Sequence, residues 1–388
     1  MTSPSTVRPD SPPGALPAQW VPPRRGTGAR DVLALLAVVL IAVAALGAVA
    51  LVLLQVGVGA GVVGTLLAVV PLTVVLLGIR WLDRWEPEPR GALVFGLLWG
   101  AGISVLVSLV VNDLTLYTVA QLTGDIDAGV AAATVVSAPI VEEVAKGAGV
   151  LVLFLARRRY FDGVVDGLVY AGVVAAGFAF TENILYFGRA GEMLAETFVL
   201  RGLATPFAHL LFTACTGAAL GLAARSRNRY AAWWLLPLGL LGAIVGHGLW
   251  NATSLVAGAA YLAVFAVVQV PLFGGVVGLA FWLGRQESAV IRHRLSEYAQ
   301  VGWLAPHEVD MLASLQRRRT AVGWATRAGG RPAGDAMRRF QRDATTLAFQ
   351  RQQAAIGRAD LRRHAESERE LLTAMTTDRH QVLTAAAG

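Results

Sequence analysis

The sequence has few charged residues and almost no cysteine. Only 15% of its 388 residues are charged, and 55% are hydrophobic, whereas a soluble globular chain carries about 25% charged residues. The hydrophobic content excludes intrinsic disorder for most of the chain, and the low charge excludes a single soluble globule. The one cysteine, Cys215, excludes an internal disulfide, and its apolar sequence context predicts a small buried side chain.

Long apolar runs account for the hydrophobic excess. Most of them are about 20 residues long, which is the length of helix that crosses the ~30 Å hydrocarbon core of a bilayer. The predicted fold class is therefore an all-α polytopic bundle of about eight transmembrane helices in the cell membrane. The expected spans are residues 31–54, 62–79, 91–112, 129–155, 163–188, 202–223, 231–254 and 260–283.

The arginines predict the orientation of this bundle, because positively charged residues remain on the cytoplasmic side. They precede the first span and lie between spans two and three, four and five, and six and seven, whereas the alternate loops contain only Arg189 and Arg201. Both termini are therefore expected in the cytoplasm. The predicted domains are a disordered proline-rich cytosolic arm (1–30), an eight-span membrane domain (31–284, catalytic core about 129–254) and a basic helical cytosolic tail (285–388).

The tail holds most of the net charge of +7. From Arg285 onward, 17 arginines and no lysine stand against 11 aspartates and glutamates, a balance of +6. Two breaking motifs, Gly329-Gly330 and Pro332-Ala-Gly334, predict that the tail is divided into two or three helical pieces. The favoured interpretation is a helical appendage held partly by anionic lipid head groups, with a regulatory or partner-binding role as the alternative. Nucleic acid is not an expected partner, because no stacking aromatics are interleaved with the arginines.

Ionisable side chains inside a membrane span are costly and usually functional. At 1.5 Å per residue, Glu182, His209 and His247 each lie about 9–11 Å from the extracytoplasmic end of their span, with the paired glutamates somewhat deeper. A shared intramembrane site is the economical explanation for this common depth. The polar residues of the four consecutive spans are Glu142, Glu143 and Lys146 in span four, Asp166, Glu182 and Asn183 in span five, His209 in span six, and His247 and Asn251 in span seven.

The spacing of these residues is compatible with hydrolytic chemistry. Glu142 and Lys146 are four residues apart, as are His247 and Asn251, so each pair shares one helix face. A carboxylate beside imidazoles can activate water, and two histidines with one or two glutamates form a zinc ligand set with an open position. The alternatives are a proton relay in a transporter and a non-catalytic scaffold. The nearly pure Val, Leu and Ala composition of the cytoplasmic halves of spans four and six argues against a path through the membrane.

The ordered set of motifs resembles the PrsW family of intramembrane proteases, within the wider group of CAAX prenyl endopeptidases and bacteriocin-immunity proteins. The resemblance covers residues 80–255 approximately. It rests on Trp85-Glu-Pro-Glu-Pro-Arg90, Glu142-Glu143-x-x-Lys146, Asp166-Gly167-x-x-Tyr170, Phe178-x-x-x-Glu182-Asn183, His209-x-x-x-Thr213 and His247-x-x-Trp250-Asn251.

The resemblance implies an endopeptidase that cuts a membrane-anchored protein, such as an anti-sigma factor, in the extracytoplasmic half of the bilayer. Glu182 stands where the prenyl-endopeptidase branch has a histidine, so a zinc-dependent and a metal-free mechanism both remain open. The implied roles are activation of water by Glu142 or Glu143, stabilisation of the oxyanion by Asn251, ligation of zinc or positioning of water by Glu182, His209 and His247, and support by Lys146, Asn183 and Asp166.

Overall fold

The computed structural model describes residues 29–158, 161, 163–226, 228, 230–256, 261–357 and 361–387, and no strand occurs among them. The all-α prediction is therefore confirmed. Residues 1–40 and 41–388 form two separate compact units. The first includes the beginning of helix α1 (Ala29–Val56), and the predicted arm over 1–30 lies, except for its last two residues, outside the described part of the chain.

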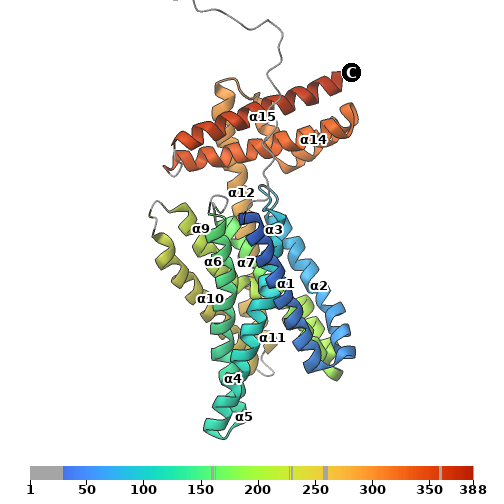
Figure 1. Cartoon of the computed structure of the whole chain (residues 1–388), viewed down its shortest axis with the longest axis vertical. Helices are drawn as coiled ribbons and strands as arrows, with labels where there is room; N and C mark the ends of the chain where they lie inside the picture. Colours follow the sequence, from blue (N-terminus) through green and yellow to red (C-terminus); the bar gives the residue numbers. More distant parts are fainter. Residues whose placement is uncertain are drawn as a thin grey trace, which may run out of the picture. The chain divides into compact units, whose positions relative to one another are not determined.

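The second unit contains a bundle of long apolar helices (Figure 1). Several of them pass through a π-helical turn without a break in the helix. In chain order, the elements after α1 are α2 (Val58–Leu82); α3 (Arg90–Trp99), the π-turn η1 (Gly100–Ser104) and α4 (Val105–Thr123); α5 (Ile126–Ala131), the π-turn η2 (Ala132–Ser137) and α6 (Ala138–Ala156); α7 (Val164–Arg189); the 3-10 turn η3 (Gly191–Met193), α8 (Leu194–Thr197) and the π-turn η4 (Phe198–Ala204); α9 (Ala208–Arg225); α10 (Ala231–Val256); and α11 (Tyr261–Val264), the π-turn η6 (Phe265–Gln269) and α12 (Val270–Gln300).

Seven helical segments of the described chain are long and apolar enough to cross a membrane, and they correspond to expected spans one to three and five to eight. The remaining expected span, 129–155, corresponds to α5, η2 and α6, where Glu142, Glu143 and Lys146 interrupt the apolar composition. A multi-pass membrane protein is thus confirmed. The orientation of its termini stays a prediction.

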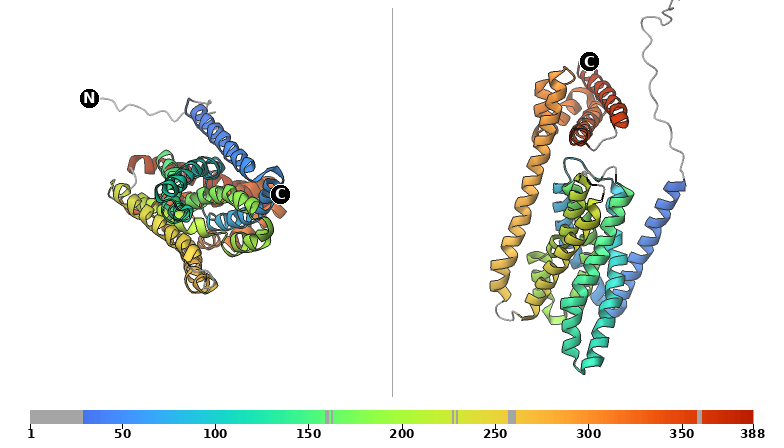
Figure 2. Two further views of the ribbon diagram at one scale, coloured as in Figure 1. Left: turned by 90° about the horizontal axis from the view of Figure 1, so that it is seen from below. Right: turned by 90° about the vertical axis from the view of Figure 1, so that its left-hand side faces the viewer.

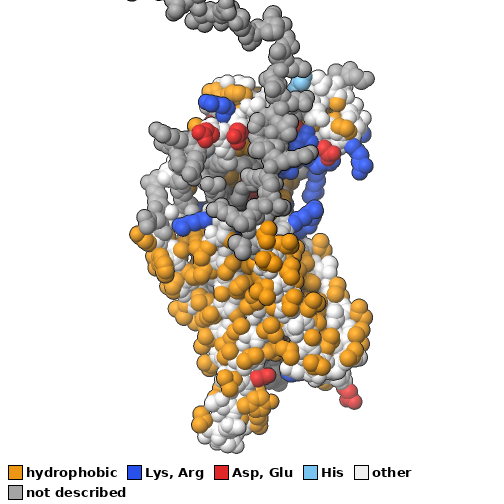
Figure 3. Space-filling view, in the orientation of Figure 1, with side chains coloured by type: hydrophobic (Ala, Val, Ile, Leu, Met, Phe, Trp, Pro, Cys, Tyr) orange, Lys and Arg blue, Asp and Glu red, His pale blue; other side chains and the backbone are white. Residues whose placement is uncertain are grey.

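The outer surface of the bundle is apolar. Hydrophobic side chains cover it on the face drawn in Figure 3, while charged side chains gather mainly beyond its ends. Cys215, which we expected to be buried, is exposed on α9. The expectation was wrong because an apolar sequence context implies burial against protein only in a water-soluble fold, whereas lipid surrounds the outer face of a membrane helix.

Helix α7 is the centre of the bundle, because it packs against α2, α9, α6, and α3 with η1. Glycines permit close approach of the backbones: a Cβ atom at Gly167 would lie 2.0 Å from the carbonyl oxygen of Gly217 on α9. At the α3 contact, a Cβ atom at Gly177 would lie 2.0 Å from the carbonyl oxygen of Leu97. Small residues are what such close helix contacts require in a membrane. The central position of α7 holds Glu182 and Asn183 in the interior of the bundle.

The C-terminal tail is a helical unit attached through α12. This helix is continuous across the predicted domain boundary at residue 284 (Figure 2, orange). It is followed by α13 (Pro306–Leu312), α14 (Leu315–Ala355) and α15 (Leu361–Ala387), and the last two lie side by side (Figure 1). The predicted interruption near Gly329 and Gly330 is confirmed: both depart from helical dihedrals, and Gly330 has φ of 70°.

The tail has a hydrophobic core, and Trp85 from the loop between α2 and α3 is part of it. The Trp85 side chain is 6% exposed, and the guanidinium of Arg318 lies 5.0 Å from its ring. The same loop is tied to the bundle, because the carboxylate of Glu88 accepts a hydrogen bond from the hydroxyl of Tyr170 on α7. Protein contacts therefore hold the tail to this loop, which the lipid-binding interpretation did not include. The other members of this hydrophobic core include Ile291 and Leu295 (α12), Leu312 (α13), Leu347 (α14) and Met375 (α15).

Replacing Trp85 with alanine is expected to loosen the tail. Truncating a buried tryptophan costs about 3–5 kcal/mol, so Trp85→Ala should accelerate tryptic cleavage at the tail arginines at least tenfold in detergent micelles. The matched control is Trp324→Ala, because Trp324 lies in the tail and is 43% exposed. Equal cleavage rates for the two variants would contradict a structural role for Trp85.

Candidate active site

Helix α6 carries three ionisable residues within one turn and a half, and all of them are buried. Glu142 is 4% exposed, while Glu143 and Lys146 are fully buried. Lys146 is the single lysine of the sequence. Its Nζ lies 2.6 Å from Oε1 of Glu143 and 3.6 Å from Oε2 of Glu142. One ammonium therefore balances much of the charge of two adjacent carboxylates in a medium of low dielectric constant.

Glu143 is the most fully bonded of these groups. Its Oε1 is paired with Lys146 and lies 3.1 Å from Nδ1 of His247 on α10, while its Oε2 accepts a hydrogen bond of 2.9 Å from the hydroxyl of Thr213 on α9. A buried carboxylate is tolerated when several donors satisfy it in this way. The Glu143 carboxylate thus joins α6, α9 and α10 at one point.

Two carboxylates fix the orientation of the two histidines. Because Glu143 accepts a hydrogen from Nδ1 of His247, Nε2 carries the lone pair, and it lies 3.9 Å from Oε2 of Glu142. Nε2 of His209 lies 2.8 Å from Oε2 of Glu182, which leaves Nδ1 as the acceptor facing Lys146 at 3.3 Å. These tautomers follow from the hydrogen bonds that the partners require. Each imidazole therefore has one nitrogen held by a carboxylate and one nitrogen with a lone pair.

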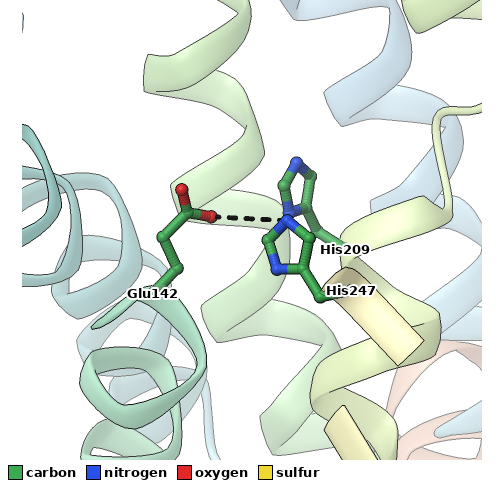
Figure 4. Close-up of side chains that lie close together, drawn as sticks. All are labelled: Glu142, His209 and His247. Atoms are coloured by element: carbon green, nitrogen blue, oxygen red, sulfur yellow. Dashed lines mark ion pairs between the residues drawn. The ribbon is translucent and has the colours of Figure 1, made fainter. Parts of the chain in front are cut away.

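Glu142, His209 and His247 converge on one point (Figure 4). One ligand atom from each of the three lies within 4.8 Å of the others. Oε2 of Glu142 is buried and makes no hydrogen bond with any described residue. Two imidazoles and one carboxylate are a zinc ligand set that leaves a position for water, and carboxylates behind metal-binding histidines are a common supporting arrangement. The residues present therefore fit a zinc ion, for which Nδ1 of His209 would exchange its contact with Lys146.

The acidic member of this set differs from our expectation. The sequence predicted Glu182 as the ligand beside His209 and His247, whereas Glu142 lies with them. Glu182 instead forms an ion pair of 2.5 Å with Arg201 and supports His209 from behind. Glu182 as a metal ligand therefore stays a prediction, and Arg201, which we assigned to a loop, folds into η4 and pairs with its carboxylate.

Arg201 is the main site residue that the sequence did not indicate. Its Nε donates to Oδ1 of Asn183 at 3.2 Å, and its guanidinium stacks 3.7 Å from the ring of Tyr186. Asn183 therefore holds Arg201, which in turn holds Glu182. The sequence offered one indication of this role, because Arg201 stands in a stretch that is otherwise poor in arginine. That indication alone does not predict where the side chain lies.

Two other residues expected at the site, Asn251 and Asp166, lie in different places. Asn251 lies one turn after His247, and its Nδ2 donates to the carbonyl oxygen of Thr134 in η2 at 2.9 Å. Asp166 does not reach the site. Its Oδ2 accepts a hydrogen bond from the backbone N–H of Gly163 at 3.0 Å, which caps the start of α7. It precedes Glu182 by 16 residues on this helix, a separation of about 24 Å. The contact that the structure gives it is therefore the cap of α7.

The convergence point opens into a cavity of about 450 Å³. Glu142, His209 and His247 line this cavity, as do Arg201 and Asn251, whereas Glu143 and Lys146 do not. The adjacent glutamates of α6 therefore differ in position: Glu142 faces the space in which a substrate can bind, and Glu143 lies behind it. The sequence left open which of the two activates water, and this geometry favours Glu142.

Comparisons with known proteins agree with the sequence motifs. Residues 88–284 match the family described as PrsW family intramembrane metalloprotease. A protein named Protease PrsW from Clostridioides difficile (strain 630) is 30% identical over 153 residues, which are 39% of this chain and 62% of that protein. Another of that name, from Geobacillus kaustophilus (strain HTA426), is 35% identical over 174 residues, 44% of this chain and 72% of the relative. No solved structure matches the chain.

The buried pair of Glu143 and Lys146 is expected to behave as a unit. Removing one partner leaves an uncompensated charge, so Glu143→Gln and Lys146→Met should each lower the free energy of unfolding by about 3–5 kcal/mol. The double variant should be more stable than either single variant, because no buried charge is left without its partner. Unfolding in mixed detergent micelles measures all three values. Additive losses would show that the two side chains do not interact.

Proposed function

The chain belongs to the PrsW family of intramembrane metalloproteases, and we propose that it is an endopeptidase that hydrolyses peptide bonds of membrane-anchored proteins. The observation that carries the proposal is the placement of Glu142. Its buried carboxylate faces the cavity, makes no hydrogen bond through Oε2 to the part of the chain that the structure describes, and lies beside two oriented histidines. This arrangement suits the activation of a water molecule next to a peptide carbonyl.

Glu142, His209 and His247 are the residues that would hold a zinc ion. Zinc bound there supplies a Lewis acid and lowers the pKa of water. Glu143 and Glu182 keep the two imidazoles in the orientation that ligation requires, each through the nitrogen that faces away from the convergence point. Lys146 limits the repulsion between the two glutamates of α6.

In the proposed reaction, the oxygen of Glu142 that would not bind zinc accepts a proton from water while the water oxygen bonds to the peptide carbonyl carbon. Glu142 then passes this proton to the leaving nitrogen as the C–N bond breaks, so that water is divided between the two products. Asn251 has one amide hydrogen engaged by Thr134 and a second one with which to stabilise the oxyanion. The buried setting strengthens each of these electrostatic interactions.

We place the reaction in the extracytoplasmic half of the bilayer and take an anti-sigma factor as the class of substrate. Support for the location comes from the arginine distribution, because the positive-inside rule puts the ends of α7 and α10 nearest Glu182 and His247 on the extracytoplasmic side. The substrate class rests on the resemblance of the sequence motifs.

Cleavage of a single-span substrate in liposomes tests the proposal. Glu142→Gln keeps the size of the side chain but removes the proton acceptor, so the turnover rate should fall about 10²–10⁴-fold. Asp166→Asn is the matched control, because Asp166 is also an acidic residue of a span but caps α7 away from the cavity. Its rate should remain within twofold of the wild type. Wild-type cleavage by Glu142→Gln would refute the assignment.

A further inference from the structure

A second, smaller cavity adjoins the candidate active site. It has a volume of about 50 Å³ and is lined mainly by apolar side chains of η4, α9, α10, η6 and α12. Thr205, Ala208 and Trp250 line both this cavity and the large one. Only these three side chains of the described residues therefore form the shared wall. The space between α12 and the α9–α10 pair, which we term the α12 seam, thus lies directly beside the site.

Helix α12 is weakly attached along this seam. Only 11% of the apolar stretch that contains it is buried, in contrast to 72% for α7. Its contacts with the bundle include the ring of Phe273 against Phe207 at a centroid distance of 5.1 Å. Nearer the tail, Phe281 packs against Trp81 at 4.6 Å. A helix held by a few aromatic contacts and otherwise exposed to lipid separates from its neighbours more readily than α7 does.

A polar side chain lies in this apolar seam. Gln269, at the end of η6, is 5% exposed and lines the small cavity. Its Oε1 makes no hydrogen bond with any described residue. A buried amide oxygen without a donor is unfavourable, and π-helical turns often occur at functional sites. Gln269 therefore indicates a ligand that brings an N–H group into the seam.

We propose that the α12 seam admits the membrane-embedded segment of a protein substrate from the lipid, and that Gln269 binds the backbone of that segment. The inference rests on the proposed protease function. A segment about to be cut must be unwound, and its exposed N–H groups then need acceptors, which lipid does not supply. Gln269 provides one such acceptor, its amide oxygen, in the small cavity beside the candidate active site. A lipid chain is a poorer occupant, because it brings no amide donor to this oxygen.

A reversible cross-link tests the seam. In a Cys215→Ala background, Phe207→Cys with Phe273→Cys places a thiol on each side of it, and a short bis-methanethiosulfonate reagent joins them. Cleavage of a single-span substrate in liposomes should fall at least tenfold, and dithiothreitol should restore it. The control pair is Trp81→Cys with Phe281→Cys, which ties the same helix near the tail. The linked control should keep at least half of its activity.

The outcomes separate this inference from the function on which it rests. Absence of cleavage by the unlinked, reduced protein would reject the protease function itself. Undiminished cleavage by the linked seam, or equal inhibition by both cross-links, would reject entry through the seam. If a lipid is the natural occupant of the seam, cleavage by the linked protein should be undiminished.

Gln269→Leu tests the backbone contact separately. It removes the acceptor and keeps the approximate volume, so KM should rise about fivefold while kcat stays within twofold. Val268→Leu is the control, because Val268 lies on the same turn but is 56% exposed. An unchanged KM for Gln269→Leu would exclude Gln269 as a substrate contact.

Discussion

The structure of the site depends on one buried carboxylate. Glu143 is paired with Lys146 on its own helix, with Thr213 on α9 and with His247 on α10. In lipid none of these groups could turn to water instead, so each must find its partner within the bundle. The same bonds that make the charge tolerable also select the tautomer of His247. The contacts that join the three helices are therefore the same contacts that orient His247.

That constraint divides two adjacent glutamates into different roles. Glu143 uses both oxygens inside the protein, whereas Glu142 lines the cavity and has one oxygen with no hydrogen bond to any residue in the described ranges. Glu182 repeats the supporting arrangement on the other histidine, with Arg201 as its counter-ion. Each histidine is thus oriented by a carboxylate that is itself held by a cation, and α7, the best-packed helix, carries one of the two supports.

Hydropathy predicted the bundle well, because membrane thickness fixes the length of a span. From a common depth in the membrane we correctly predicted that five residues lie close together: Glu142, Glu143, Glu182, His209 and His247. Depth, however, does not say which side of a helix a residue faces in a bundle with unknown neighbours. Depth therefore did not distinguish Glu142 from Glu182 as the carboxylate that lies with both histidines. Contacts made by segments outside the expected spans could not be predicted from hydropathy or depth. Arg201 folds back into the site, and Trp85 enters the core of the tail.

The central claim is that Glu143 prepares the site without facing the substrate. It is tested most directly by the zinc affinity of purified, folded protein, compared between the wild type and Glu143→Gln. The account predicts one zinc ion per wild-type chain and binding about 10–100-fold weaker in the variant, because the second carboxylate no longer fixes His247. Equal affinities, or no zinc bound by the wild type, would contradict it.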